Sequence, residues 1–188
     1  RDEPFVFQLG KGQVIEGWDQ GVVGMKVGGE RRLVVPPELG YGDRGTPSIP
    51  GGATLIFEVA VLDVPRIEVE TLVAGAGEPV AEGDLVQVHY SGWLQAEDGT
   101  KGEKFDSSLD RNRTFPVKLG AGKVIPGWEK GLLGMQPGEQ RRLFIPPELA
   151  YGSRGVRVGS EYRIPPGAPL IFDVELVEVV DRAGAATP

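Results

Sequence analysis

The sequence predicts an α+β fold in which a small antiparallel β-sheet wraps around one short α-helix. Most apolar residues lie in β-branched runs that partly alternate with polar residues, as in antiparallel strands with one face on a core. One short segment instead spaces its apolar residues three and four positions apart, which is typical of a helix. The same order of segments occurs twice along the chain. We therefore expect one domain type in one complete and one partial copy.

Four runs in the second part of the chain are predicted to be strands. They are IEVETLV at 67–73, DLVQVHYSGWL at 84–94, EQRRLFIP at 139–146 and LIFDVELVEVV at 170–180. Each is rich in Val, Ile, Leu or aromatic residues, and the charged residues between them suit the solvent face of a sheet. Strands are therefore expected to dominate the domain.

The predicted helix is IPGWEKGLLGM at 125–135. Pro126 suits the first turn of a helix, whereas the internal Gly131 weakens it. The apolar residues at helical spacing are Ile125, Trp128, Leu132 and Met135, and the first copy repeats them as Ile15, Trp18, Val22 and Met25. After the next strand, PPEL is predicted to form a tight turn or a single helical turn that positions Tyr41 or Tyr151.

The repeat becomes visible when Phe5 is aligned with Phe115. Residues 5–45 and 115–155 then share the letters LG.G.VI.GW, G..GM, RRL, PPEL and YG.RG. The loop that follows is longer in the second copy, VRVGSEYRIPPG against TPSIPGG, and the copies align again at LIFEVAVLDV and LIFDVELVEV. One domain type is therefore present twice.

The two copies are unequal in length. The first copy starts at Arg1, which aligns with Arg111, so residues like those at 66–110 precede only the second copy. We expect a partial domain at 1–65 that holds only its C-terminal half, a complete domain at 66–180 and a flexible tail at 181–188. Our preferred explanation is that the first domain and the native N-terminus begin upstream of this sequence. The alternative is a half-domain completed by a strand from a partner.

Composition excludes several classes of function. The chain has 188 residues, a net charge of −7 and a pI near 4.9, which disfavours binding to nucleic acid or to an anionic membrane surface. No apolar run approaches the roughly 18 residues that a spanning helix needs. With no cysteine and one histidine, His89, the chain offers no thiol chemistry and no histidine-rich metal site. Neither a metal nor a cofactor is expected.

A family resemblance is carried by three segments. They are VHYSGWL, then KFDSSLDRNRTFPVKLGAGKVIPGWEKGLLGMQPGEQRRLFIPPELAYG, and finally IPPGAPLIFDVELVEV. In this order they strongly resemble the FKBP-type peptidyl-prolyl cis-trans isomerases, a family known for binding immunosuppressive macrolides. The resemblance covers one complete domain and the later half of another. It implies an FKBP-like twisted antiparallel sheet around one short helix.

Isomerisation of an X-Pro bond suits a sequence with aromatic and aliphatic motifs. The barrier to rotation is about 18 to 20 kcal/mol because the planar amide is stabilised by resonance. In the twisted transition state the conjugation is broken and the amide is less dipolar, so an apolar pocket favours it over the ground state. This chemistry requires no nucleophile or metal, and no Ser/His/Asp set, HExxH motif or P-loop is present.

The resemblance also implies which residues form the site. Trp128 would be the floor, Asp106 would orient the ligand by hydrogen bonding rather than act as a base, and the Ile125 N–H and the Tyr151 hydroxyl would donate to the ligand. The implied catalytic set is Tyr90, Phe105, Asp106, Trp128, Tyr151 and Phe172, and the implied substrate-binding set is Phe115, Val124, Ile125 and Ile164. The matching residues of the first copy are Phe5, Val14, Ile15, Trp18, Tyr41, Ile49 and Phe57. Counterparts of Tyr90, Phe105 and Asp106 are missing there, so the first site is incomplete within this chain.

The sequence departs from the family pattern at two places. A histidine common after the YG..G turn is replaced by Val156, and by Thr46 in the first copy. The longer loop at 156–167 is expected to overhang the site, where Tyr162 or Arg163 contacts the peptide.

Some signals also have structural interpretations. His89 is expected to be structural, and Asp106 with Ser107 and Ser108 fits a simple turn cap as well. The paired arginines at 31–32 and 141–142 are expected to face alternate sides of a strand, one of each pair in water.

Three functions remain open from the sequence. The first is a peptidyl-prolyl isomerase that assists protein folding, with proline-containing unfolded chains or peptides as substrates and macrolides as inhibitors. The second is a peptide-binding or chaperone module that retains the pocket without turnover, and the third is a scaffold. A bacterial cytoplasm or periplasm is compatible with the lack of cysteine.

Overall fold

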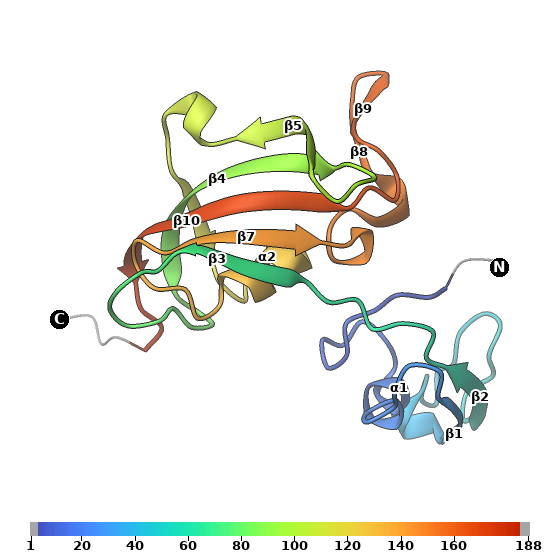
Figure 1. Cartoon of the computed structure of the whole chain (residues 1–188). Coiled ribbons are helices and arrows are strands. Elements are labelled where there is room, and N and C mark those ends of the chain that lie inside the picture. Colours follow the sequence, from blue (N-terminus) through green and yellow to red (C-terminus); the bar gives the residue numbers. More distant parts are fainter. Residues whose placement is uncertain (1–3, 185–188) are drawn as a thin grey trace. The chain divides into compact units, whose positions relative to one another are not determined.

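The chain folds as two separate units in the computed structural model, which describes residues 4–184. Unit 1 is Arg1–Val64 and unit 2 is Pro65–Pro188. Each unit is described by itself below, with the elements labelled as in Figure 1. Among the described residues, no helix is long and apolar enough to cross a membrane.

Unit 2 is built on an antiparallel sheet. Its described residues form six strands in the order β3-β7-β10-β4-β5, with β6 paired to β4 (Figure 1). The strands are β3 (Glu68–Val73), β4 (Leu85–Gln95), β5 (Lys101–Ser107), β6 (Phe115–Lys118), β7 (Gln140–Ile145) and β10 (Leu170–Asp181). The predicted α+β fold and its four predicted strands are confirmed. β5 and β6 were not predicted.

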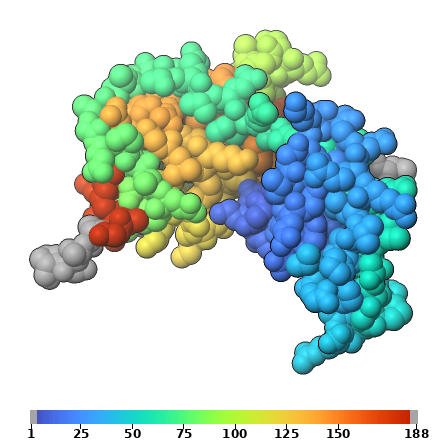
Figure 2. Space-filling model, turned by 90° about the horizontal axis from the view of Figure 1, so that it is seen from below, coloured from blue at the N-terminus to red at the C-terminus, as the bar shows by residue number. Residues whose placement is uncertain are grey.

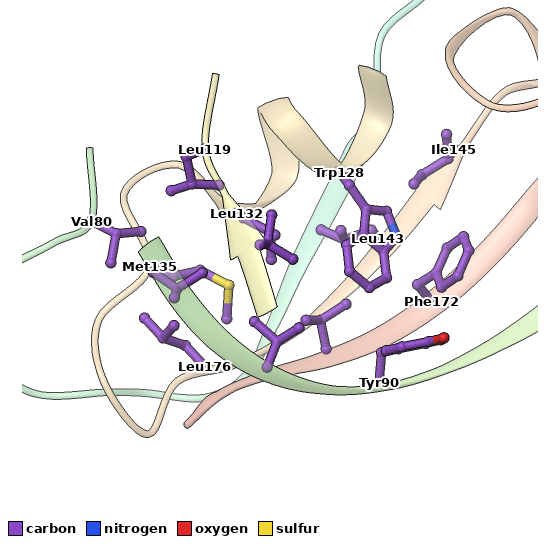
Figure 3. Close-up of a cluster of buried hydrophobic side chains, with 14 of the residues drawn as sticks. Val80, Tyr90, Leu119, Trp128, Leu132, Met135, Leu143, Ile145, Phe172 and Leu176 are labelled. Atoms are coloured by element: carbon purple, nitrogen blue, oxygen red, sulfur yellow. The ribbon is translucent and has the colours of Figure 1, made fainter. Parts of the chain in front are cut away.

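The predicted helix is also present, as α2 (Pro126–Leu132). Ile125 is extended and Pro126 takes the first helical position, where its missing N–H leaves no hydrogen bond unmade. The helix lies over one face of the sheet, and Figure 3 shows its buried side chains directed toward the strands. The core between them consists mainly of Val86, Val88, Val117, Leu119, Trp128, Leu132, Met135, Leu143, Ile145, Leu170, Phe172, Val174 and Leu176.

Two glycines let α2 approach β7 closely. A Cβ atom on Gly127 would lie 2.4 Å from Ile145 Cγ2, and one on Gly131 would lie 2.6 Å from Leu143 Cδ1. Both distances are shorter than van der Waals contact allows, so only glycine fits without displacement of the strand side chains. Gly131 therefore lowers helix propensity but is required by the packing.

Arg141 ties the C-terminal end of α2 to β7. Its Nη1 atom donates to the carbonyls of Gly131 and Leu133, each at 3.0 Å, and its Nε donates to the buried Glu139 carboxylate. The neighbouring Arg142 pairs with Asp173 across the sheet. The two arginines thus bond to different elements, and Arg142, the member expected in water, is only partly exposed because it pairs with Asp173.

The longer loop of the second copy forms a hairpin. β8 (Val156–Val158) and β9 (Glu161–Ile164) pair with each other as a two-stranded sheet. Three 3-10 helices, η2 (Leu109–Arg111), η3 (Pro147–Leu149) and η4 (Gly152–Arg154), complete unit 2, and η3 is the predicted turn. From the sequence this segment was predicted only as a longer loop, without strands.

The flexible tail predicted at 181–188 does not start at residue 181, because the first residues of this range are bound to the domain. Asp181 belongs to β10, Arg182 donates to the carbonyls of Glu78 and Pro79, and the Ala183 N–H donates to Asp84. In Figure 2 the red surface of this segment lies beside green surface of unit 2. The prediction is wrong for 181–183 because the nearly buried Asp84 carboxylate binds this part of the chain. Residues 185–188 of the predicted tail lie outside the described residues.

Unit 1 repeats the central packing of unit 2. It contains α1 (Glu16–Gly21), β1 (Glu30–Val35), η1 (Pro37–Leu39) and β2 (Leu55–Ala60), and β1 pairs with β2. Gly17 faces Val35 and Gly21 faces Leu33, as the glycines of α2 face β7. Arg31 likewise donates to the carbonyls of Gly21 and Val23.

We expect Gly127→Ala to destabilise unit 2 although alanine is the better helix former. The added methyl group would overpack the contact with Ile145, at a cost of about 1 to 3 kcal/mol, against a propensity gain of about 1 kcal/mol. Urea unfolding followed by circular dichroism measures the change. The control is Lys130→Ala on the exposed face of the same helix, expected within about 0.5 kcal/mol of the parent. A Gly127→Ala protein more stable than the parent would contradict the packing argument.

Candidate functional site

Trp128 lies at the centre of an aromatic cluster in unit 2. Its ring centroid is 5.0 Å from that of Tyr90, 5.3 Å from that of Phe172 and 6.2 Å from that of Phe115, all in edge-to-face geometry. Figure 3 shows Trp128, Tyr90 and Phe172 directed toward one another from α2, β4 and β10. Phe115 is 38% exposed, whereas Trp128 is only 4% exposed. The cluster is thus continuous with the core and reaches the surface at Phe115.

The register of β4 and β10 brings the aromatic side chains to one face. Tyr90 pairs with Val174, and Phe172 pairs with Gly92. A Cβ atom on Gly92 would lie 2.7 Å from both Phe105 Cζ and Phe172 Cε1, so the missing side chain lets these two rings meet. Their centroids are 5.5 Å apart. Sequence analysis did not single out Gly92, although its place inside a predicted strand is a signal of close approach.

A polar network borders the cluster. The Tyr90 hydroxyl donates to Asp106 Oδ2 at 2.5 Å, and Arg111 donates to Asp106 Oδ1 at 2.5 Å and to the Tyr90 oxygen at 2.9 Å. The Ser107 N–H adds a hydrogen bond to the same carboxylate. Arg111 was missed in the sequence analysis, because nothing local to η2 indicates that its partner is in β5. The network holds Asp106 and Tyr90 in one arrangement.

Burial and hydrogen bonding shift the pKa values of this network. Burial raises the pKa of Asp106, but the hydrogen bonds from Arg111 and Tyr90 and the charge of Arg111 outweigh burial and leave the pKa below its ordinary value. Burial, followed by the hydrogen bond to Asp106, raises the pKa of Tyr90. Asp106 is therefore an ionised acceptor near neutral pH, and the Tyr90 hydroxyl keeps its proton.

The neighbouring serines have structural roles. The Tyr90 N–H donates to Ser108 Oγ at 2.8 Å, and Ser107 Oγ donates to the Tyr90 carbonyl at 3.1 Å. His89 Nδ1 lies 3.0 Å from Ser108 Oγ. These contacts agree with the structural interpretation of His89 and of the serines, and they fix the backbone next to the site.

Val124 and Ile125 lie in the segment that leads into α2. The Glu129 carboxylate accepts hydrogen bonds from the N–H groups of Gly120 and Gly122, which fixes the start of this segment. The Ile125 carbonyl accepts from the Trp128 N–H, while the Ile125 N–H makes no hydrogen bond to any described residue. An N–H donor therefore remains available beside the aromatic cluster.

Tyr151 and Ile164 occupy different environments near the cluster. Tyr151 precedes η4 and is 39% exposed, and burial followed by the charge of Asp106 raises its pKa. Ile164 is 3% exposed and packs in the core, where it pairs with Val156. Ile164 thus belongs to the same buried cluster as Trp128 and Phe172.

Unit 1 brings together only part of its predicted set. Trp18 contacts Phe57 at 5.4 Å and Phe5 at 6.0 Å between ring centroids, and Phe7 joins them at 5.7 Å from Trp18. Phe5 is 68% exposed. Val14 and Ile15 precede α1, Tyr41 follows η1, and Ile49 forms an isolated bridge with Thr46. No polar network like that of Asp106 accompanies the aromatic residues described in unit 1.

The described part of the chain contains no cluster of metal-ligating side chains. No group of three or more His, Cys, Asp or Glu side chains within residues 4–184 is arranged to hold a metal ion. The site offers an aromatic surface, hydrogen-bond donors and one ionised carboxylate.

Comparison with known proteins gives a consistent result. The family model of the FKBP-type peptidyl-prolyl cis-trans isomerases matches residues 1–62 and 76–177. Human peptidyl-prolyl cis-trans isomerase FKBP10 is 45% identical over 178 residues, which are 91% of this chain and 29% of that protein. Mouse FKBP9 is 38% identical over 186 residues, which are 96% of this chain and 31% of that protein. The chain thus spans less than a third of these relatives.

Other relatives match a single domain. FK506-binding protein 2 of Candida glabrata is 60% identical over 97 residues, which are 52% of this chain and 65% of that protein. The crystal structure of AtFKBP13 superposes with a TM-score of 0.53 at 38% identity, over 61% of this chain and 93% of that chain. FkpA from Escherichia coli gives a TM-score of 0.51 at 41% identity, over 60% of this chain and 47% of that chain.

We expect Asp106→Asn to lower the stability of unit 2 at pH 7 by about 1 kcal/mol, since one acceptor of charge-assisted hydrogen bonds is weakened at a partly exposed site. Because the native pKa of Asp106 is below that of the unfolded chain, its stabilising effect is present above the unfolded pKa and is lost as pH falls through the native pKa. The difference between variant and parent should therefore shrink on acidification. Urea unfolding at several pH values measures it.

The control for this prediction is Asp110→Asn, whose carboxylate pairs with the exposed Lys104 and with no other cation among residues 4–184. Its effect at pH 7 should be smaller. A gap between parent and Asp106→Asn that widens below pH 4 would contradict the assigned direction of the pKa shift.

Proposed function

The chain belongs to the FKBP-type peptidyl-prolyl cis-trans isomerase family, and on that premise we propose that unit 2 isomerises X-Pro bonds in client polypeptides. The observation that carries the proposal is the aromatic cluster around Trp128, which reaches the surface at Phe115 and borders the Asp106 network. Accelerated folding of proline-containing chains would be the result, because uncatalysed exchange takes roughly 10 to 100 seconds.

Catalysis in this proposal is selective binding of the twisted amide. The prolyl ring packs against Trp128, with Tyr90, Phe115 and Phe172 around it. The planar amide is stabilised by resonance and is more dipolar than the twisted form, so transfer to an apolar surface destabilises the planar form more. The barrier falls without a covalent intermediate.

Polar groups at the rim orient the bound chain. The Ile125 N–H and the Tyr151 hydroxyl donate to substrate carbonyls, and the ionised Asp106 carboxylate accepts from a substrate N–H or fixes Tyr90 in place. Asp106 does not act as a general base, because Tyr90, Arg111 and Ser107 already donate to it and its pKa is lowered.

Unit 1 contributes an incomplete version of the same surface. Phe5, Trp18 and Phe57 supply aromatic contacts, but this sequence has no counterparts of Tyr90, Phe105 and Asp106. We therefore assign the activity of this chain to unit 2. FK506-binding protein 2 is a relative named for its ligand, and macrolide inhibition is proposed for unit 2 on that basis.

The full chain should accelerate isomerisation of a short X-Pro peptide, and Phe115→Ala should lower kcat/KM by about tenfold. That factor corresponds to loss of about 1.4 kcal/mol of transition-state contact with one aromatic wall. The measurement is a peptide isomerisation assay on the parent and on the variant, with circular dichroism to verify folding.

The control for the assay is Leu133→Ala, because Leu133 has a similar exposed fraction, 41%, but lies outside the aromatic cluster. It should turn over the peptide like the parent. A folded parent that binds the peptide without accelerating its isomerisation would refute the enzyme proposal and favour a peptide-binding module.

A further inference from the structure

The β8–β9 hairpin distinguishes unit 2 from unit 1 next to the candidate site. In unit 1 the corresponding segment contains only an isolated bridge between Thr46 and Ile49. In unit 2 the segment is longer and forms a paired hairpin, in which the Arg157 guanidinium lies 4.4 Å from the centroid of the Tyr162 ring. The hairpin is therefore an ordered element that can present side chains in fixed positions.

Arg163 in β9 extends from this hairpin to the edge of the aromatic cluster. Its Nε donates to the Phe105 carbonyl at 2.7 Å, and its Nη2 atom lies 3.9 Å from Asp106 Oδ1. The side chain is half exposed. One hydrogen bond fixes the guanidinium, while its remaining N–H donors make no hydrogen bond to any described residue.

A cavity of about 330 Å³ lies beside Arg163. It is lined by Lys104, Phe105, Asp106, Ser107, Asp110, Arg111 and Arg163. Phe105 and Asp106 therefore border both this cavity and the candidate site. The cavity is therefore next to the aromatic cluster, since the ring of Phe105 contacts that of Phe172 with 5.5 Å between centroids.

The lining of this cavity contains three cations but only two carboxylates. Lys104 pairs with Asp110 at 2.8 Å, and Arg111 pairs with Asp106 at 2.5 Å. Arg163 is the third cation, and its distance of 3.9 Å from Asp106 is at the limit of an ion pair. Since Asp106 already accepts from three donors, Arg163 gives the cavity an excess positive charge.

We propose that this cavity is a subsite for an acidic side chain adjacent to the proline of the substrate, with Arg163 as the residue that selects it. The substrate carboxylate accepts hydrogen bonds from the free N–H donors of Arg163, and the positive charge of the cavity favours it over a neutral or basic side chain. The inference rests on the proposed isomerase function and specifies its substrates. No bond is made or broken at the subsite.

The test compares matched X-Pro peptides on the full chain. One series places Glu, Gln or Lys directly before the proline, and a second series places them directly after it. In at least one series, kcat/KM for the Glu peptide should exceed that for the Gln peptide by about 3- to 5-fold, as for a partly exposed ion pair. The Lys peptide should be the poorest substrate, and added salt should reduce the preference.

The variant Arg163→Gln should bring the Glu to Gln ratio close to one. Arg154→Gln is the matched control, because Arg154 is an exposed arginine of η4 that does not line the cavity. It should keep the ratio of the parent, and Arg163→Lys should keep part of it. Equal kcat/KM for Glu and Gln peptides in both series, or a preference that survives in Arg163→Gln, would overturn the inference.

Peptide binding separates this inference from the proposed function. If the parent turns over none of the peptides, the isomerase proposal fails. The dissociation constants of the same peptides then test whether the subsite for an acidic side chain exists. Tighter binding of the Glu peptide that is lost in Arg163→Gln then supports the subsite, and equal dissociation constants refute it.

Discussion

The packing of α2 against β7 is the constraint on which the rest of unit 2 depends. Gly127 and Gly131 bring the helix so close to Ile145 and Leu143 that no larger residue fits. At this separation Trp128 projects among the aromatic side chains of β4 and β10. The same contact therefore completes the core and forms the floor of the candidate site, so stability and site geometry cannot be altered independently there.

Polar interactions hold the rim of this aromatic surface in place. Tyr90 belongs to both the aromatic cluster and the polar network, since its ring packs on Trp128 and its hydroxyl donates to Asp106. Arg111 neutralises the carboxylate, and Ser108 fixes the Tyr90 backbone. An ionised group can thus lie next to apolar rings because all of its charge is compensated locally. The rim can orient a ligand without supplying a proton.

Comparison of the two units shows which features belong to the packing of the helix on the strands and which belong to the candidate site. Unit 1 keeps the helix glycines, the arginine that binds the helix carbonyls, and a carboxylate, Asp19, that accepts from the N–H groups of Gly10 and Gly12. Asp19 is the counterpart of Glu129. These features are local to a helix, a strand and one loop. The charged rim has no equivalent among the described residues of unit 1, so the packing scheme exists without the site.

The sequence by itself determined the repeat, the helix, four strands and the aromatic residues of the site, because spacing and side-chain type report local conformation and burial. Only the tertiary structure decided that β10 lies between β7 and β4, that Gly92 makes room for Phe105, and that Arg111 and Arg163 reach Asp106. It also decided that β8 and β9 form a hairpin and that Arg182 anchors the C-terminal segment. Periodicity along a chain identifies the face of a helix or strand that a residue occupies. The partner of that residue depends on contacts between residues far apart in sequence, which a local pattern does not reveal.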